Sequence, residues 1–163
     1  MDFVNAELPP EFVSLYCYRP DPGGGGASVI SPVNLIKRLP RDDLELLAQR
    51  AYRDGVVRDL SEVGNDINPF AVWDAGKAFP VRWTGKLLST TDDPARRAAL
   101  ERMSGLLESA EVAARLEPGE MLVLDQRRVV HGRRALGERS DAHTAGRLLM
   151  HAFARDRGSS TEP

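Results

Sequence analysis

Apolar residues gather in short blocks near both ends of the chain, and these blocks predict strands. Residues 12–18 (FVSLYCY) are rich in aromatic and aliphatic side chains, which is typical of a buried strand. A second short strand is expected at 28–30. Towards the other end, residues 121–125 (MLVLD), 129–132 and 148–153 show the same apolar character. The pattern therefore predicts sheet at both ends of the sequence.

The middle of the chain carries helix signals instead. Ser31-Pro32 predicts a helix start, with Ser31 as the cap and Pro32 at the first helical position. Leucine and alanine recur at helical spacing over 42–52, which predicts a second helix. From Gly55 the period changes, and short strand-like pieces are expected at 55–60 and 78–90.

The clearest helix opens at Asp93-Pro94, with a buried stripe expected at Leu100, Met103, Leu107 and Ala110. Strands at both ends that enclose a helical insertion predict an α+β fold, with helices set against an antiparallel sheet. The sequence shows no internal repeat and no linker long enough to separate domains.

Composition narrows the class of protein. The 163 residues suit one domain, and 22 Lys and Arg against 24 Asp and Glu argue against a general nucleic-acid binder. Cys17 is the single cysteine, so an internal disulfide framework is excluded, and its apolar strand predicts a buried, unreactive thiol. No apolar run reaches the roughly 20 residues of a membrane-spanning helix. The N-terminus lacks the features of a secretion signal. A cytoplasmic domain that binds neither membrane nor nucleic acid is expected.

Three candidate chemistries fail because residues that each of them needs are missing. The run Gly23 to Gly26 could cradle a phosphate, but no Gly-Lys-Ser/Thr follows it, so a flexible turn is favoured. No serine lies in a Gly-x-Ser-x-Gly setting, and no His and Cys cluster has zinc-site spacing.

The segment PGEMLVLDQRRVVHGRRALG carries more candidate functional residues than any other. A turn, an apolar strand and a polar elbow lead to His131, and Arg147 stands before the last strand. A single histidine after a strand is more often structural. An arginine that enters a sheet, however, needs an anionic partner. The two residues together suggest a metal beside an anionic ligand.

This segment resembles the C-terminal part of the iron(II)/2-oxoglutarate-dependent oxygenases of the TauD/TfdA, clavaminate-synthase-like family. Residues 118–133 are similar to the family's strand and its D-N-x-R-x-x-H-G-R elbow, with Gln126 where Asn is commoner. The resemblance implies that His131 is an iron ligand and that Arg147 holds the distal carboxylate of 2-oxoglutarate. It assigns a contact with the same cosubstrate to Ser28. Arg133 is a candidate supporting residue, with an exposed arginine as the alternative.

The family's other two iron ligands form a His-x-Asp or His-x-Glu motif upstream of the first strand. Counting back from residues 15–19 places the carboxylate on Asp2, and the histidine would precede Met1, where the sequence has no residue. The resemblance thus implies Asp2 and His131 as catalytic iron ligands, and an aspartate at position 2 is typical of hydroxylases rather than halogenases. We expect Met1 to occupy an internal position of a longer protein.

The implied fold is mainly β, a double-stranded β-helix (jelly roll) with helical insertions that lacks its N-terminal strands. One domain over 1–155 and a polar tail over 156–163 are expected. The implied function is hydroxylation or desaturation of a small molecule with Fe(II), 2-oxoglutarate and molecular oxygen, and a homo-oligomer is compatible with exposed sheet edges.

Two alternatives stay open. The first is a catalytically incomplete fragment or interaction domain with the same fold. The second, a cupin-like sugar isomerase or metal-binding barrel, is disfavoured because it does not explain the spacing of Arg147. Residues 81–84 (VRWT) lack the acid that contacts substrate in amino-acid-oxidising relatives, which argues against a basic amino acid as substrate. Residues 65–73 are a candidate pocket-lining loop, with an ordinary surface loop as the alternative.

Overall fold

Strands and helices alternate in blocks along the residues that the computed structural model describes, which are 10–53, 69–138 and 146–154. The strands are β1 (Phe12–Arg19), β2 (Ser28–Pro32), β3 (Val112–Ala114), β4 (Met121–Asp125), β5 (Val129–Arg133) and β6 (Leu148–Ala154). The helices are the 3-10 helix η1 (Val33–Arg38), α1 (Arg41–Leu47), α2 (Leu87–Thr90) and α3 (Pro94–Ser109). The chain divides into two compact units, one of 1–9 and 31–111 and the other of 10–30 and 112–163.

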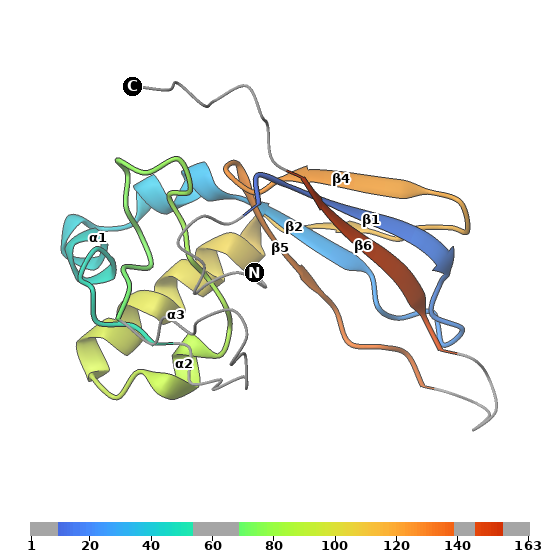
Figure 1. The fold of residues 1–163 in the computed structure, drawn as a ribbon. Helices are drawn as coiled ribbons and strands as arrows, with labels where there is room; N and C mark the ends of the chain where they lie inside the picture. Colours follow the sequence, from blue (N-terminus) through green and yellow to red (C-terminus); the bar gives the residue numbers. More distant parts are fainter. Residues whose placement is uncertain (1–9, 54–68, 139–145, 155–163) are drawn as a thin grey trace, which may run out of the picture. The chain divides into compact units, whose positions relative to one another are not determined.

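Two three-stranded sheets carry the strands, with the orders β4-β1-β6 and β3-β2-β5. In Figure 1, β1 lies between β4 and β6. It pairs antiparallel with both, so that Leu15 stands opposite Leu122 on one side and His151 on the other. β2 pairs antiparallel with β3. The strand that begins the described chain is thus central in its sheet and brings the C-terminal strand beside it.

The core of the second unit joins these two sheets. Val13, Leu15 and Leu124 are buried, and Ile30 and Val129 from the other sheet pack against them. The alternation along β1 places every second side chain in this core, as expected for a strand with one buried face. The two sheets therefore face each other across an apolar layer.

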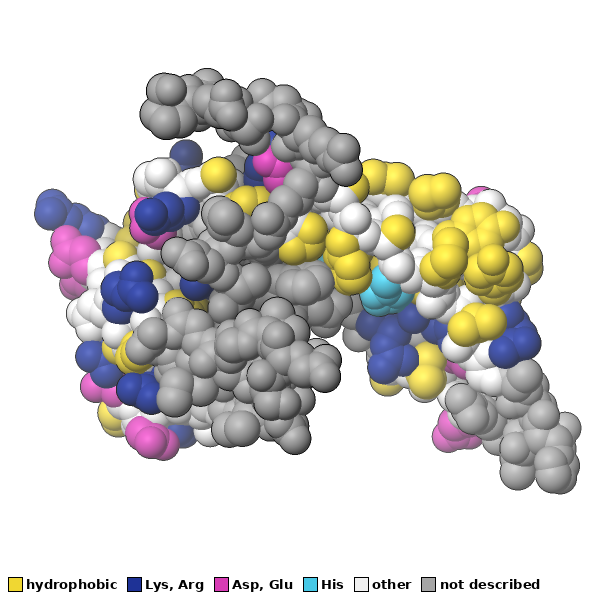
Figure 2. Space-filling model, viewed as in Figure 1, with side chains coloured by type: hydrophobic (Ala, Val, Ile, Leu, Met, Phe, Trp, Pro, Cys, Tyr) yellow, Lys and Arg dark blue, Asp and Glu magenta, His cyan; other side chains and the backbone are white. Residues whose placement is uncertain are grey.

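The opposite face of sheet β4-β1-β6 carries large apolar side chains that are exposed. Tyr16 of β1 stands opposite Met121 and Met150, and Ser14 stands opposite Val123. Figure 2 shows hydrophobic side chains gathered over these strands. The large apolar residues of this face that are about half exposed or more are Tyr18, Met121, Val123, Leu148 and Met150. Exposed apolar area of this kind is typical of a surface that another polypeptide covers.

The first unit is built around α3, with η1, α1 and α2 packed against it (Figure 1). Asp93 caps the helix by accepting a hydrogen bond from the Arg96 nitrogen at 2.8 Å, and Pro94 occupies the first helical position. Leu100, Met103 and Leu107 form its buried face. None of the helices in the described ranges is long and apolar enough to cross a membrane.

Most predicted strands and the main helix are confirmed. The strands expected at 12–18, 28–30, 121–125, 129–132 and 148–153 agree with β1, β2, β4, β5 and β6, and the helix opened by Asp93-Pro94 agrees with α3. The combination of sheet at both ends with a helical insertion is therefore correct. The structure adds β3, a three-residue strand too short to leave a pattern in the sequence.

The predicted helix start at Ser31 is wrong. Ser31 lies within β2, and its buried hydroxyl donates to the Leu107 carbonyl oxygen at 2.9 Å rather than capping a helix. The helix that follows is a 3-10 helix that begins at Val33. Pro32 precedes it with an extended backbone. Pairing of β2 with β3 covers Ser28 to Ile30, and the strand itself continues to Pro32.

Two further expectations in the first unit are corrected. The helix predicted over 42–52 ends at Leu47, because Tyr52 forms an isolated β-bridge with Phe70 and is drawn into the core. The strand-like stretch 78–90 contains only the bridge residue Val81 and then the short helix α2. The strand expected at 55–60 and the tail at 156–163 lie outside the described residues.

Candidate functional site: an arginine-bearing pocket in the two-sheet unit

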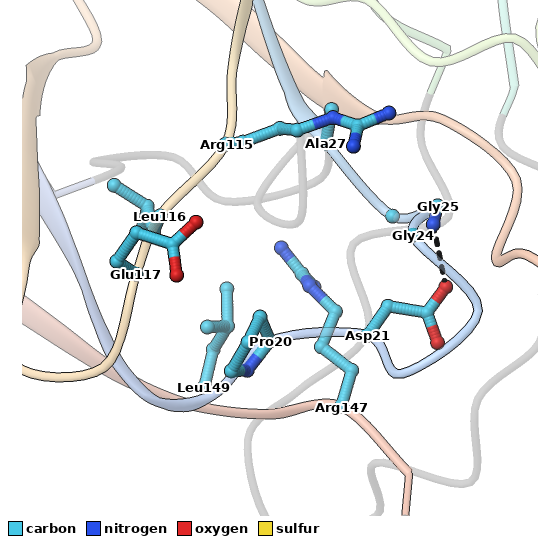
Figure 3. Close-up of a pocket in the computed structure, with 11 residues that line it drawn as sticks. Pro20, Asp21, Gly24, Gly25, Ala27, Arg115, Leu116, Glu117, Arg147 and Leu149 are labelled. Atoms are coloured by element: carbon cyan, nitrogen blue, oxygen red, sulfur yellow. Dashed lines mark hydrogen bonds between the residues drawn. The ribbon is translucent and has the colours of Figure 1, made fainter.

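A pocket of about 170 Å³ lies beside the Gly-rich turn that follows β1. Its wall consists of the turn on one side, the residues after β3 on another, and the start of β6 below (Figure 3). The lining residues are Pro20, Asp21, Gly24, Gly25, Gly26, Ala27, Arg115, Leu116, Glu117, Arg147 and Leu149. All belong to the two-sheet unit. Four of the eleven lining residues are charged, and the others are glycine, proline, alanine or leucine.

Arg147, which lines this pocket, contacts Ser28 although 119 residues separate them. Arg147 Nη2 donates to Ser28 Oγ at 3.5 Å, and the Ser28 side chain is buried. The start of β6 is fixed from β1, because Arg19 Nε donates to the Gly146 carbonyl oxygen at 2.7 Å. Pairing of β6 with β1 therefore carries Arg147 to the hydroxyl at the start of β2.

The charge of Arg147 is poorly compensated in this surrounding. Its pKa is lowered, first because burial removes water from the guanidinium and then because Arg133 repels it. Asp21 and Cys17 act in the opposite direction. A half-buried cation with a second cation near it favours an anionic ligand, whose charge would offset both effects.

Cys17 lies beneath this site as the buried thiol that the sequence predicts. Its Sγ donates to the Leu116 carbonyl oxygen at 3.3 Å. Burial raises the pKa of the thiol, and the nearby positive charge of Arg147 only partly opposes that shift. The thiol is therefore a packing group rather than a nucleophile.

His131 sits on β5 at a half-buried position, and the elbow before it is tied down by backbone contacts. The Gln126 side chain donates through Nε2 to the Pro10 carbonyl oxygen at 2.8 Å. Asp125 Oδ1 accepts from the Arg127 nitrogen at 3.0 Å and from its Nε at 2.9 Å. These hydrogen bonds from Arg127 lower the pKa of the Asp125 carboxyl. The polar elbow thus sets where β5 starts, and the sequence indicated its position but not these partners.

The predicted site residues are brought together only in part. Arg147 contacts Ser28, and its charge is repelled by the exposed Arg133 of β5. Asp2 lies outside the described residues. Within the described ranges, no three His, Cys, Asp or Glu side chains are grouped to hold a metal ion. The geometry therefore describes a pocket lined by Arg147, which contacts the buried Ser28 hydroxyl, and the roles of His131 and Asp2 at a metal stay predictions.

A comparison with protein-family models identifies the family of the chain. The model described as "Taurine catabolism dioxygenase TauD, TfdA family" matches residues 1–152. The chain belongs to this family. The expected family membership is thus confirmed, and the match includes the positions of all five predicted site residues.

Curated proteins and solved structures agree with this membership. The chain is 30% identical to L-lysine 3-hydroxylase of Catenulispora acidiphila over 93% of its own length and 43% of that protein. It is 26% identical to clavaminate synthase 2 of Streptomyces clavuligerus over 82% of its own length and 42% of that protein. A structure of asparagine oxygenase with Fe(II), 2S,3S-3-hydroxyasparagine and succinate superposes with a TM-score of 0.74 at 26% identity, over 93% of this chain and 47% of that one. The chain therefore spans less than half the length of these relatives.

Three charged residues of the pocket were not predicted as site residues, namely Asp21, Arg115 and Glu117. Arg115 and Glu117 follow β3, which left no signal in the sequence. Asp21 lies between two prolines in a turn-forming stretch, where an aspartate is common because it favours turns. The sequence therefore showed no sign of a further role. The long-range partners of Asp21 become visible only in the folded chain.

The loop expected to line a substrate pocket has a described part, residues 69–73, that packs inside the first unit. Phe70, Val72 and Trp73 are buried there, and Trp73 forms an isolated bridge with Val81. None of them lines the pocket of Arg147. Residues 65–68 lie outside the described ranges.

Proposed function

We propose that this protein is a non-haem iron(II)/2-oxoglutarate-dependent oxygenase that hydroxylates or desaturates a small molecule, with free amino acids as the substrate class. The observation that carries the proposal is the contact of Arg147, which lines a pocket of the two-sheet unit, with the buried hydroxyl of Ser28. Membership of the TauD/TfdA family supports the cosubstrate. The similarity to a lysine 3-hydroxylase and to an asparagine oxygenase supports the substrate class.

The pocket suits one carboxylate of 2-oxoglutarate. Arg147 offers a guanidinium and Ser28 a hydroxyl within 3.5 Å of it, so one carboxylate could accept hydrogen bonds from both. Its negative charge would offset the burial and the Arg133 repulsion that lower the pKa of Arg147. The role of Arg147 is therefore to bind and orient the cosubstrate.

The metal would be held by His131 together with Asp2, the pair that the resemblance to the family implies. An imidazole and a carboxylate suit iron(II) in the family's arrangement of two histidines and one carboxylate. Bound iron(II), with 2-oxoglutarate and oxygen, supplies the oxidising power that converts a C–H bond of the substrate to C–OH while 2-oxoglutarate becomes succinate and CO₂. We also propose that the two facing sheets are part of a double-stranded β-helix, a view supported by the superposition on asparagine oxygenase.

Calorimetric titration with 2-oxoglutarate tests the proposal. We expect Arg147→Ala to weaken binding about 10- to 100-fold, since hydrogen bonds to charged groups contribute roughly 1.5–3 kcal/mol. Arg128→Ala is the matched control, because Arg128 is an exposed arginine of the same unit outside the pocket. Equal affinity of the wild type and Arg147→Ala would reject the anchor role.

Turnover is tested separately with iron(II), oxygen and a panel of free amino acids. Succinate formation that depends on one of them, together with a product heavier by one oxygen atom, is the expected result for a hydroxylase. Tight binding of 2-oxoglutarate without turnover of any candidate would instead favour the catalytically incomplete interaction domain. The large exposed apolar face of sheet β4-β1-β6 is the observation that supports this second candidate.

A further inference from the structure

The Gly-rich turn after β1 lies flat against the segment that follows β5. The Gly26 nitrogen donates to the Ala135 carbonyl oxygen at 2.7 Å, and the Arg134 nitrogen donates to the Ala27 carbonyl oxygen at 2.9 Å. A Cβ atom added at Gly25 would overlap the backbone of Gly137. Because the two backbones are in direct contact, no side chain fits between them at this point.

Asp21 joins the two segments through a single carboxylate oxygen. Its Oδ2 accepts from the Gly25 nitrogen at 2.9 Å and from the Gly137 nitrogen at 2.6 Å, although 116 residues separate Asp21 from Gly137. Its backbone carbonyl also accepts from the Gly24 nitrogen at 3.0 Å. The contact with Gly25 is drawn in Figure 3. Asp21 is only 7% exposed, so the cost of burying its charge must be offset by such hydrogen bonds.

Both segments lead directly to residues of the proposed cosubstrate site. The turn ends at Ser28, and the segment on the other side follows His131 and Arg133 of β5. The Arg147 side chain runs past Gly26, where an added Cβ would lie only 3.0 Å from Arg147 Cδ. The position of the turn therefore decides the path by which the guanidinium reaches Ser28.

We propose that Asp21 is a positioning residue of the 2-oxoglutarate site. By holding the Gly-rich turn against residues 134–138, its carboxylate fixes the wall along which Arg147 reaches Ser28. This inference rests on the proposed function, because it assumes that Arg147 and Ser28 bind the cosubstrate. Asp21 itself is assigned no contact with the cosubstrate, and its effect passes through the backbone of the turn.

The test compares three variants by calorimetric titration of the full chain with 2-oxoglutarate. Asp21→Ala removes the bridging oxygen, and we expect binding to weaken at least about tenfold, as for loss of hydrogen bonds to a charged group. Asp21→Asn keeps an oxygen that can accept from the same two N–H groups, so binding within about threefold of the wild type is expected. Val13→Ala weakens the core of the same unit without touching the turn and should leave the affinity unchanged.

Several outcomes would overturn the inference. Unchanged affinity of Asp21→Ala would do so, and so would an equal loss in Asp21→Ala and Val13→Ala, which would indicate a general loss of stability. If Asp21→Asn binds as weakly as Asp21→Ala, the charge of Asp21 rather than its bridging geometry is responsible. These results leave the proposed function intact as long as Arg147→Ala still weakens binding. Absence of binding to the wild type would reject the proposed function and this inference together.

A measurement on the wild type covers the case in which Asp21→Ala does not fold. Addition of 2-oxoglutarate should slow amide hydrogen exchange at Gly25 and Gly137 more than at Leu122, which pairs with β1 away from the pocket. Equal protection at all three amides would contradict the role of the turn.

Discussion

At the residue scale, the clearest electrostatic contact of the first unit is that between Asp43 of α1 and Arg102 of α3. Arg102 Nε and Nη2 donate to the two carboxylate oxygens of Asp43 at 2.6 and 2.5 Å. The Asp43 side chain is only 5% exposed, whereas that of Arg102 is 51% exposed. The hydrogen bonds from Arg102 lower the pKa of the Asp43 carboxyl, and burial opposes this shift less strongly. The paired geometry explains how a carboxylate can lie against α3.

This shift predicts how stability depends on pH. A carboxyl group with a lowered pKa in the folded state stabilises the protein above its ordinary value of 3.8 and loses that contribution as the pH falls towards the lowered value. Asp43→Asn should therefore unfold at lower urea concentration than the wild type at neutral pH. It should also lose less stability when the pH is lowered to about 2.5.

Urea titrations at several pH values measure both effects. Asp42→Asn, which changes the exposed neighbour on the same helix, is the control and should follow the wild type. Parallel stability curves for Asp43→Asn and the wild type across the acid range would show that the pair does not carry this dependence.

At the scale of the elements, α3 is the helix whose limits follow most directly from local chemistry. Asp93 satisfies the Arg96 N–H, and Pro94 occupies a position that needs no N–H donor. Its C-terminal side is held as well, because Ser31 of β2 donates to the Leu107 carbonyl oxygen. The helix therefore begins for a local reason and is anchored by a long-range one.

Removal of the cap should lower stability by a predictable amount. Asp93→Ala is expected to reduce the free energy of unfolding by about 0.5–2 kcal/mol, because the Arg96 N–H loses its acceptor at the exposed helix start. Asp92→Ala, one residue earlier and also exposed, should change it by no more than about 0.5 kcal/mol. Urea denaturation monitored by circular dichroism measures both, and equal losses in the two variants would contradict the capping role.

At the scale of the whole molecule, the described residues fall into a helical unit and a two-sheet unit. The chain has two tryptophans, Trp73 and Trp83, and both belong to the helical unit. The pocket with Arg147 belongs to the other unit. These positions provide separate probes of the two units, and the prediction of one domain over 1–155 can be tested with them.

If the chain is one cooperative domain, a ligand bound in the two-sheet unit must stabilise the helical unit as well. At about 100 times its dissociation constant, 2-oxoglutarate should add roughly 2.7 kcal/mol and raise the midpoint of tryptophan fluorescence and of circular dichroism together. Arg147→Ala, with its 10- to 100-fold weaker binding, should reduce this gain to about 0.4–1.4 kcal/mol at the same ligand concentration. Separate transitions for the two signals would instead indicate that the units unfold independently.

The sequence could predict those parts of the protein whose causes are local. The run of aromatic and aliphatic residues over 12–18 marks β1, and the Asp93-Pro94 pair marks the start of α3. The polar elbow pointed to His131 and the family. Residues 42–52 had helical spacing throughout, but the helix ends at Leu47 because Tyr52 pairs with Phe70 across the unit. Propensity therefore yields to tertiary contact where the two compete.

The sequence by itself determined the main strands, the principal helix, the family resemblance and the identity of the candidate residues. Only the tertiary structure decided that Arg147 meets Ser28 and that Asp21 holds Gly137, across 119 and 116 residues. The physical reason is that periodicity and capping depend on neighbours within one or two turns. Distant side chains meet only when strand register and sheet packing have been fixed by the whole core.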